Sequence, residues 1–289
     1  MNLLRRVEGE VLERLGRVSV VARQAVESLL SGQHHSIHRG LSVEFAGHRP
    51  YAPGDDPRRI DWLVYARTDR HEVRLYEEEA RLNALIVLDV SGSMAYGGKL
   101  DRACLLAAAL AALMMRRGDQ VGLALVDTAL RLHLPPMASM PHLLRLLEAL
   151  EKLRPAGETA LGPVLETLAL RLRRRGLVLL ISDGLDDPER LGRALRHLRH
   201  RRQEVRLVQV LDPDELAFPL RGQVLLAGLE GEPSLGVDAD RLRDRYRTAV
   251  AAHQQGLMRA CRESGATWDL CRADEDPVLF LGRMLAGGP

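Results

Sequence analysis

The spacing Asp89-x-Ser91-x-Ser93 places one carboxylate and two hydroxyls on alternate residues directly after an apolar run. In an extended backbone, alternate side chains point to the same side, so these three groups would converge on one point. Carboxylate and hydroxyl oxygens are hard ligands, the kind that Mg²⁺ prefers in proteins. The spacing therefore favours a divalent-cation site.

Two buried strands are expected to carry this chemistry to one edge of a sheet. Residues 85–88 and Val90 are apolar on both faces, which is typical of a strand covered by helices on both sides. Asp89 fits such a strand only at its carboxyl end, where ligands bind in open α/β sheets. Residues 177–181 repeat the pattern and end in Ser182-Asp183-Gly184. We therefore expect Asp183 to lie near Asp89.

Thr159, in the loop before a predicted helix, completes the candidate set. Each member also has a simpler structural explanation: Asp89 as a helix cap, the serines as turn residues, Thr159 as an N-cap and Asp183 as the end of a strand. For Thr159 alone, capping is the favoured interpretation. Taken jointly, the residues favour a shared cation, Mg²⁺ or another divalent ion such as Ca²⁺ or Mn²⁺. The predicted ligands are Asp89, Ser91, Ser93, Thr159 and Asp183.

The elements around these residues alternate between strands and helices. Such alternation implies βαβ units with right-handed crossovers, and so a Rossmann-like, doubly wound α/β fold with a mostly parallel sheet. Residues 121–126 and 130–134 form a predicted hairpin, which supplies one antiparallel edge strand. The other predicted strands are 84–90, 177–181, 205–210, 223–229 and 267–271, and the predicted helices are 101–117, 139–153, 161–175, 188–202, 240–263 and one from 276.

An N-terminal helix over residues 3–30 and a small strand and loop extension precede this sheet. We expect three regions: 1–80 with the helix and the extension, 81–235 with the metal-binding domain, and 236–289 with a helix, strand and helix packed on that domain. Within the extension, Asp55, Asp56 and Asp61 are expected to form a salt-bridged loop with nearby arginines.

Other histidines and aromatic residues are assigned structural roles. His34, His35 and His38 are interpreted as part of a polar loop, because no cysteine or HExxH spacing accompanies them. His253 lies on the apolar stripe of its helix and is expected to be a buried histidine with one hydrogen-bond partner. Trp62 and Tyr51 are expected to anchor the core or a loop.

Composition names no partner by itself. The 41 basic and 39 acidic residues leave a formal charge of +2, and the three cysteines have no spacing typical of zinc ligands or of a disulfide framework. The charged N-terminus does not resemble a signal peptide. The longest apolar run, 104–115, is too short to span a bilayer. We expect a cytoplasmic protein without a membrane span.

Nucleic-acid binding is an alternative because residues 171–202 contain ten arginines and four acidic residues, a local balance of +6. However, the whole chain uses arginine, with Lys99 and Lys152 as its only lysines, and aromatic residues do not accompany the arginines. A solvated helix face is therefore favoured, and a nucleic-acid partner is not expected.

A magnesium-dependent phosphatase with Asp89 as nucleophile is the other alternative. Enzymes of the haloacid dehalogenase type place a second aspartate two residues later, where this chain has Ser91. A serine hydroxyl without a histidine base is a poor nucleophile. The sequence also lacks a G-x-x-x-x-G-K-[ST] phosphate loop, so the chain should not hydrolyse ATP. We expect a protein that is not an enzyme.

Two resemblances extend this interpretation. Asp89-Val-Ser-Gly-Ser93, Gly157-Glu-Thr159 and Ser182-Asp183 resemble the metal-ion-dependent adhesion site of von Willebrand factor A domains. That resemblance implies that the serines and the threonine hold Mg²⁺, directly or through water, while the aspartates stabilise the shell. It also implies that an acidic residue of a partner takes the remaining coordination position.

The segment before the site resembles the signature of the bacterial domain of unknown function 58 family. The matching residues are Gly32-x-His34-x-Ser36, Val43-Glu-Phe45, Arg49-x-Tyr51, Pro53-Gly-Asp-Asp56, Arg59-Ile-Asp-Trp62 and Ala66-Arg67. This family is similar in organisation to co-factors of MoxR-type AAA+ ATPases. The resemblance implies an adaptor in protein maturation or remodelling, whose partner is such an ATPase, an acidic client protein, or both.

Overall fold

The computed structural model describes residues 43–53, 55–78, 82–172 and 174–286. The chain divides into two compact units, Leu30–Arg81 and the remainder, which comprises Met1–Leu29 and Leu82–Pro289. The predicted helix over residues 3–30 and the histidines His34, His35 and His38 lie outside the described residues.

In the smaller unit, strand β1 (Val43–Pro50) pairs antiparallel with β2 (Glu72–Glu78). A 3-10 turn, η2 (Pro57–Arg59), and helix α3 (Trp62–Thr68) connect them. The expected salt-bridged loop is present: Arg49 donates to both oxygens of Asp55, at 2.7 and 2.6 Å. Asp61 caps α3 and contacts His48 Nε2 at 2.9 Å.

The expected anchoring role of Trp62 is wrong. Its side chain is 58% exposed, and its ring meets Tyr65 edge-on with the centroids 6.1 Å apart. Tyr51 is also exposed, at 36%. Trp62 is the first residue of α3, a short helix without a buried residue, so this helix offers no core for the ring to anchor.

The described residues of the larger unit form a six-stranded sheet in the order β10-β7-β6-β3-β4-β5. All neighbours pair in parallel except β4 and β5, so β5 is an antiparallel edge strand. The predicted fold class, doubly wound and mostly parallel with one antiparallel edge, is confirmed. The strands are β3 (Asn83–Asp89), β4 (Gln120–Val126), β5 (Leu130–Met137), β6 (Gly176–Ser182), β7 (Gln203–Leu211) and β10 (Thr267–Arg272).

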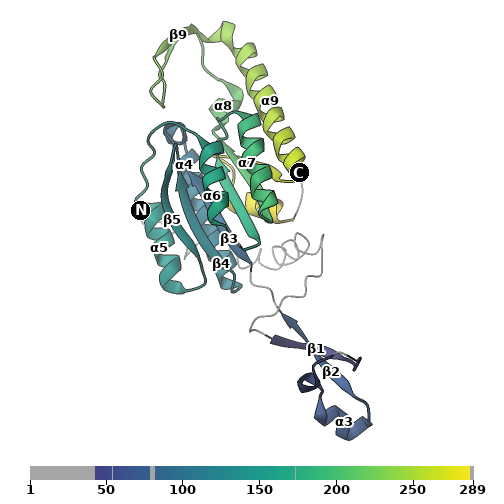
Figure 1. Ribbon diagram of the computed structural model, residues 1–289. Helices are drawn as coiled ribbons and strands as arrows, with labels where there is room; N and C mark the ends of the chain where they lie inside the picture. The colour runs from purple at the N-terminus through teal and green to yellow at the C-terminus, as the bar shows by residue number, and fades with distance from the viewer. Residues whose placement is uncertain (1–42, 54, 79–81, 173, 287–289) are drawn as a thin grey trace. The chain divides into compact units, whose positions relative to one another are not determined.

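Helices cover both faces of this sheet (Figure 1). One core contains residues of α4 (Lys99–Arg116), α5 (Met140–Glu151) and α10 (Pro277–Leu285), and the other contains residues of α6 (Leu161–Arg171), α7 (Pro188–His200) and α9 (Ala239–Ser264). Strand β3 serves both: Ile86 and Leu88 face the first core, and Leu85 and Val87 face the second. This is why its sequence is apolar throughout.

The topological switch point of the sheet lies between β3 and β6. After β3 the chain adds β4 and β5 on one side, then crosses back to place β6 and β7 on the other. In open α/β sheets a crevice for ligands forms at the carboxyl ends of the strands where the winding reverses. Asp89 and Ser182 are the last residues of these two strands.

The segment predicted as a strand over 223–229 does not join the sheet. Its first part forms β8 (Gln223–Leu226), which pairs antiparallel with β9 (Leu235–Asp238) in a separate hairpin between α8 (Pro213–Ala217) and α9. Its apolar residues are not buried: Leu225 is 71% exposed. The place beside β7 belongs to β10, which is flanked by α9 and α10.

Candidate metal and ligand site

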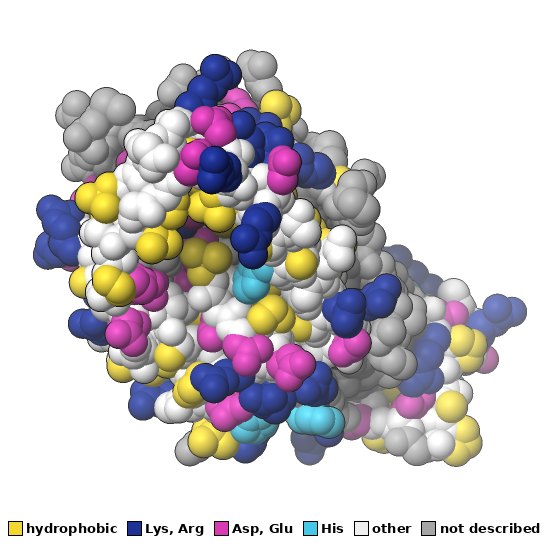
Figure 2. Space-filling model, turned by 90° about the horizontal axis from the view of Figure 1, so that it is seen from above, with side chains coloured by type: hydrophobic (Ala, Val, Ile, Leu, Met, Phe, Trp, Pro, Cys, Tyr) yellow, Lys and Arg dark blue, Asp and Glu magenta, His cyan; other side chains and the backbone are white. Residues whose placement is uncertain are grey.

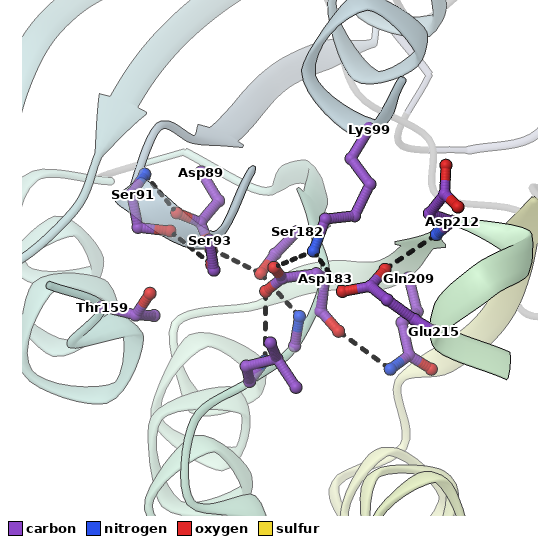
Figure 3. A network of polar contacts seen from close by, with 12 residues as sticks. Asp89, Ser91, Ser93, Lys99, Thr159, Ser182, Asp183, Gln209, Asp212 and Glu215 are labelled. Atoms are coloured by element: carbon purple, nitrogen blue, oxygen red, sulfur yellow. Dashed lines mark hydrogen bonds and ion pairs between the residues drawn. The ribbon is translucent and has the colours of Figure 1, made fainter. Parts of the chain in front are cut away.

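The five predicted residues lie at the carboxyl edge of the sheet (Figure 3). Asp89 ends β3, and Ser91 and Ser93 follow in a turn that contains the 3-10 helix η3 (Gly92–Ala95). Thr159 precedes α6, and Asp183 follows β6. Asp89, Ser91 and Asp183 are fully buried, whereas Thr159 is half-buried. Three loops far apart in the sequence thus meet at one place.

Asp89 is a buried carboxylate held by hydrogen bonds. Its Oδ1 accepts from the backbone nitrogen of Ser91 at 3.0 Å, and its Oδ2 accepts from Ser182 Oγ at 2.6 Å. Burial, followed by repulsion from the charge of Asp183, raises the pKa of Asp89 to about 6 against an ordinary value of 3.8. A positive charge near these carboxylates would relieve both effects.

The hydroxyls of Ser91 and Ser93 converge, with their oxygens 3.2 Å apart. The interpretation of Thr159 as an N-cap is wrong, since the N-cap of α6 is Ala160. The hydroxyl of Thr159 points elsewhere and donates to Glu230 Oε1 at 2.8 Å. The hydroxyls of Ser91, Ser93 and Thr159 therefore contact other groups of the site and do not cap a helix.

Lys99 is an unexpected member of the site. Its Nζ lies 2.8 Å from Asp183 Oδ2 and 2.7 Å from Glu215 Oε1, and its side chain is fully buried (Figure 3). Burial alone would lower the pKa of Lys99, but the charges of Asp183 and Glu215 and their hydrogen bonds outweigh it, so the pKa is raised. Lys99 is a permanent cation inside the site.

Glu215 connects this cation to α8. Its Oε2 accepts from the backbone nitrogen of Asp212 at 2.8 Å, and Asp212 in turn caps the helix, so the two residues form a capping box. Burial raises the pKa of Glu215 more than its ion pair with Lys99 lowers it. The network Asp183, Lys99 and Glu215 fixes the segment that leads into the β8–β9 hairpin.

The sequence analysis gave Lys99 no role in the site, although one signal could have revealed it. In a chain whose basic residues are nearly all arginine, Lys99 is one of two lysines. A lysine ammonium is compact, whereas a guanidinium is a planar fork that would not fit the same enclosed space between two carboxylates. A lysine six residues after Ser93 in such an arginine-rich chain is therefore informative.

The loop after β6 is held from two other elements. Gln209 Nε2, on β7, donates to the carbonyl oxygen of Asp183 at 2.8 Å. His253 Nε2, on α9, lies 2.8 Å from the carbonyl oxygen of Gly184. The predicted hydrogen-bond partner of His253 is present and belongs to the site loop, but the residue is half-buried and not buried as expected.

Glu230 is a second residue that the sequence analysis missed. It lies in the loop over residues 227–234 between β8 and β9, and its carboxylate accepts hydrogen bonds from Ser93 N at 3.2 Å and from Thr159 N at 3.0 Å, in addition to the Thr159 hydroxyl. Partial burial raises the pKa of Glu230, but these hydrogen bonds outweigh it and the pKa is lowered. The acidic turn Gly228-Leu-Glu-Gly-Glu232 was its sequence signal.

The donor set fits a hard cation that is held mainly by hydroxyls. Within the described ranges, no group of three or more His, Cys, Asp or Glu side chains is placed to hold a metal. Serine and threonine oxygens next to a fully buried Asp89 are nonetheless hard ligands of the kind that suit Mg²⁺. The chemistry of these donors therefore fits a hard divalent ion.

Figure 2 shows the face at the top of Figure 1. Lys and Arg side chains alternate there with Asp and Glu, and hydrophobic side chains lie between them. Among the helices that the structure describes, none combines the length and the apolar composition needed to cross a membrane.

Comparison with known proteins places the chain in a family. Residues 47–256 match the family described as "Protein of unknown function DUF58", and the chain belongs to this family. Two uncharacterized proteins, Rv1480 of Mycobacterium tuberculosis and Mb1516 of Mycobacterium bovis, are 31% identical to it over 280 residues, which cover 94% of this chain and 88% of each relative. The predicted family membership is confirmed.

Several solved structures are similar to the chain. BatB from Bacteroides thetaiotaomicron is 15% identical with a TM-score of 0.49, and the match covers 71% of this chain and 95% of BatB. The SpRpn10 VWA domain is 11% identical with a TM-score of 0.43, over 71% of this chain and 95% of that domain. The fold assignment itself rests on the strand order and pairing given above.

Proposed function

We propose that the larger unit is a divalent-cation-dependent protein-binding module. The observation that carries the proposal is the convergence of the Ser91 and Ser93 hydroxyls beside the fully buried Asp89, at the switch point of the sheet. In this proposal Ser91, Ser93 and Thr159 hold Mg²⁺ or a similar ion, and Asp89 and Asp183 stabilise that arrangement. The bound ion supplies a Lewis-acidic position for an acidic side chain of the partner.

The charges of the site support a divalent ion. The site contains the carboxylates of Asp89, Asp183 and Glu215, and the Lys99 ammonium lies within 2.8 Å of the latter two. With Glu230 bound to Thr159, the site has more carboxylates than cations, and a divalent ion would reduce this excess. Buried charges are costly unless they are paired, so binding of such an ion would stabilise the fold.

A binding role is also better supported than phosphatase chemistry. Both oxygens of Asp89 accept hydrogen bonds, and the side chain is fully buried, so it is poorly placed to attack a phosphorus atom. The hydroxyl of Ser91 contacts Ser93 Oγ and the carboxylate of Asp89, and a serine without a histidine base is a poor nucleophile. Phosphate release from a general phosphatase substrate that is abolished in Asp89→Asn would contradict this proposal.

For the partner, we propose a MoxR-type AAA+ ATPase, an acidic client protein, or both, acting with this chain in the cytoplasm. This proposal has two supports. The family is similar in organisation to co-factors of MoxR-type AAA+ ATPases. The chain also has no phosphate-loop sequence, so any ATP hydrolysis would need a separate ATPase. The chain would then act as an adaptor that recognises an acidic residue through the ion.

A magnesium titration tests the proposal. A ligand that binds only the folded state stabilises it by about 2.7 kcal/mol at a hundredfold excess over Kd. We expect Mg²⁺ to raise the Tm of the wild type and not that of Ser91→Ala. Ser139→Ala is the matched control, because this exposed serine makes no capping hydrogen bond. Equal responses of the wild type and Ser91→Ala would contradict the metal site.

Co-purification tests the partner. The full chain is immobilised and offered a purified MoxR-type ATPase, once with Mg²⁺ and once with EDTA. We expect retention with Mg²⁺, loss with EDTA, and loss in Ser91→Ala but not in Ser139→Ala. Retention that is the same in all four cases would show that the contact does not use this site.

A further inference from the structure

The hairpin between the sheet and α9 brings a carboxylate of this chain onto the candidate site. Glu230 Oε1 accepts from the Thr159 hydroxyl and from Ser93 N, and Oε2 accepts from Thr159 N. Ser93 and Thr159 belong to two of the three loops that build the site. Glu230 therefore binds the groups that a partner's acidic side chain would have to reach.

The backbones around Glu230 are shaped for this contact. A Cβ at position 92 would overlap the carbonyl oxygen of Leu229, so the hairpin loop comes this close only because residue 92 is glycine. Within the loop, the backbone nitrogen of Glu230 donates to Glu232 Oε2 at 3.0 Å. A Cβ at Gly228 would overlap Glu232 as well. The loop is thus tightly folded behind the carboxylate that it presents.

The rest of the hairpin is weakly held. Its strands have four residues each, and Leu225 and Leu235 on them are 71% and 61% exposed. Short two-stranded hairpins are marginally stable by themselves. Its base is tied to the start of α9, where Gly222 N donates to Asp240 Oδ2 and Ala239 N donates to Gly222 O. Its tip is bound to the site through Glu230, so release of Glu230 detaches the tip from the site while the base stays bound to α9.

We propose that Glu230 is an internal ligand of the site, which occupies the position of the partner's acidic side chain until that side chain displaces it. The inference rests on the proposed cation-dependent function and adds to it a competitor built into the chain. Only molecules with a released hairpin can bind an acidic partner. The apparent affinity is therefore the intrinsic affinity multiplied by the fraction of molecules in that state. The partner must carry a carboxylate that competes with an intramolecular one.

A simpler role for Glu230 is to fasten the hairpin, and the two roles predict different results. A fastener acts the same way with or without the ion, and a small carboxylate in solution cannot replace it. An internal ligand contributes to ion binding, and free acetate can take its place once its side chain is removed. The test therefore uses Mg²⁺ and acetate as probes on the full chain.

The experiment compares wild type, Glu230→Ala and Glu166→Ala, whose replaced side chain is exposed on α6. Mg²⁺ binding is measured by calorimetry and by Tm in chloride, then in acetate of equal ionic strength. We expect Glu230→Ala to bind Mg²⁺ about tenfold more weakly in chloride, the scale of losing a supporting group at a metal site. Acetate should restore its affinity, and should leave the wild type and Glu166→Ala unchanged.

Each outcome decides between the two proposals. Equal Mg²⁺ affinity of the wild type and Glu230→Ala, with no effect of acetate, would overturn the internal ligand and leave the metal site intact. If the wild type does not bind Mg²⁺, the proposed function fails. In that case stabilisation of Glu230→Ala by acetate in EDTA would retain Glu230 as an internal carboxylate of a metal-free site, and no stabilisation would overturn both proposals.

Discussion

The inner and outer halves of the site differ in the side chains that build them and in their burial. The inner half consists of Asp89, Asp183, Lys99 and Glu215, whose charges lie between the sheet, α4 and α8. The outer half consists of Ser93, Thr159 and Glu230, whose contacts join loops to an exposed hairpin. In the inner half Asp89, Asp183 and Lys99 are fully buried and Glu215 is half-buried, whereas in the outer half Ser93 is buried and both Thr159 and Glu230 are half-buried.

This difference in burial separates groups that keep their partners from groups that can exchange ligands. A buried carboxylate paired with a buried ammonium cannot trade partners without leaving a charge uncompensated, which costs several kcal/mol. A half-buried carboxylate that accepts hydrogen bonds can be replaced by water or by another carboxylate at a much smaller cost. We infer that ligand exchange takes place at the outer half, while the inner half keeps the groups in position.

The inner half should respond most strongly to the loss of its cation. Lys99→Met keeps the approximate length of the side chain but leaves Asp183 and Glu215 without their shared ammonium. We expect a loss of about 3–5 kcal/mol in the free energy of unfolding at pH 7, measured by urea denaturation. Because burial raises the pKa of Glu215, this carboxyl takes up a proton more readily on acidification, and the loss should shrink as the pH falls.

The chain supplies a matched control, because Lys152 is its only other lysine. Lys152 is mostly exposed and pairs with Glu148 on the surface of α5. Lys152→Met should change the stability by less than about 0.5 kcal/mol. Similar losses for both variants would show that Lys99 is not a buried structural cation.

The second prediction concerns Asp89, the carboxylate of the inner half that is not in the ion pairs of Lys99. The pKa of Asp89 is about 6 in the folded protein and 3.8 ordinarily, so the folded state binds this proton more tightly than the unfolded state. Ionisation of Asp89 therefore destabilises the fold, with no cost below about pH 4 and the full cost above about pH 6. A shift of about two units corresponds to about 3 kcal/mol.

Asp89→Asn removes this titration. In EDTA, we expect the variant to be more stable than the wild type by up to about 3 kcal/mol at pH 7 and equally stable near pH 4. With Mg²⁺ the difference in stability between the variant and the wild type should narrow or reverse, because only the wild type is stabilised by the ion. Urea denaturation at several pH values measures the difference. A difference that does not change between pH 4 and pH 7 would contradict the raised pKa.

Much of the fold and of the inner site could be predicted because local patterns determine them. Apolar runs that end in Asp89 and Ser182 identified β3 and β6, and strands that alternate with helices identified the doubly wound sheet. Asp187 and Pro188 marked the start of α7 correctly. These features depend on neighbours in the sequence or on the general rules of parallel sheets.

The roles of Glu230, Lys99 and Glu215 could not be predicted because they depend on distant pairings. Glu230 lies 137 residues from Ser93 and 71 from Thr159, and nothing near it in the sequence specifies either partner. Lys99 and Glu215 are 116 residues apart. Residues 223–229 carried a strand pattern, but the pattern does not reveal whether a strand joins the sheet or a separate hairpin.

The third prediction concerns the approach of the hairpin. In Gly92→Ala the new methyl group would overlap the Leu229 carbonyl, so the hairpin loop must move away from the site. We expect a loss of about 1–3 kcal/mol in stability, the usual cost of overpacking. Hydrogen exchange should rise in residues 227–234 and stay unchanged in β3 and β6. Gly222→Ala is unsuitable as a control because of its positive φ, whereas Gly236→Ala has open space around it.

The smallest change isolates one hydroxyl of the outer half. Thr159→Val keeps the shape of the side chain but removes the donor to Glu230, while Thr159 N and Ser93 N still donate to that carboxylate. Water can reach the half-buried Glu230, so we expect a loss of only about 1 kcal/mol in EDTA, and less for Thr159→Ser, which retains a hydroxyl.

The response to Mg²⁺ should separate these two variants further than stability does. If Thr159 contributes an oxygen to the ion, Thr159→Val loses most of the Mg²⁺-dependent rise in Tm and Thr159→Ser keeps it. Because both variants keep their backbone contact with Glu230, a full Mg²⁺ response in Thr159→Val would confine ion binding to the serines and leave Thr159 as an anchor for the hairpin alone.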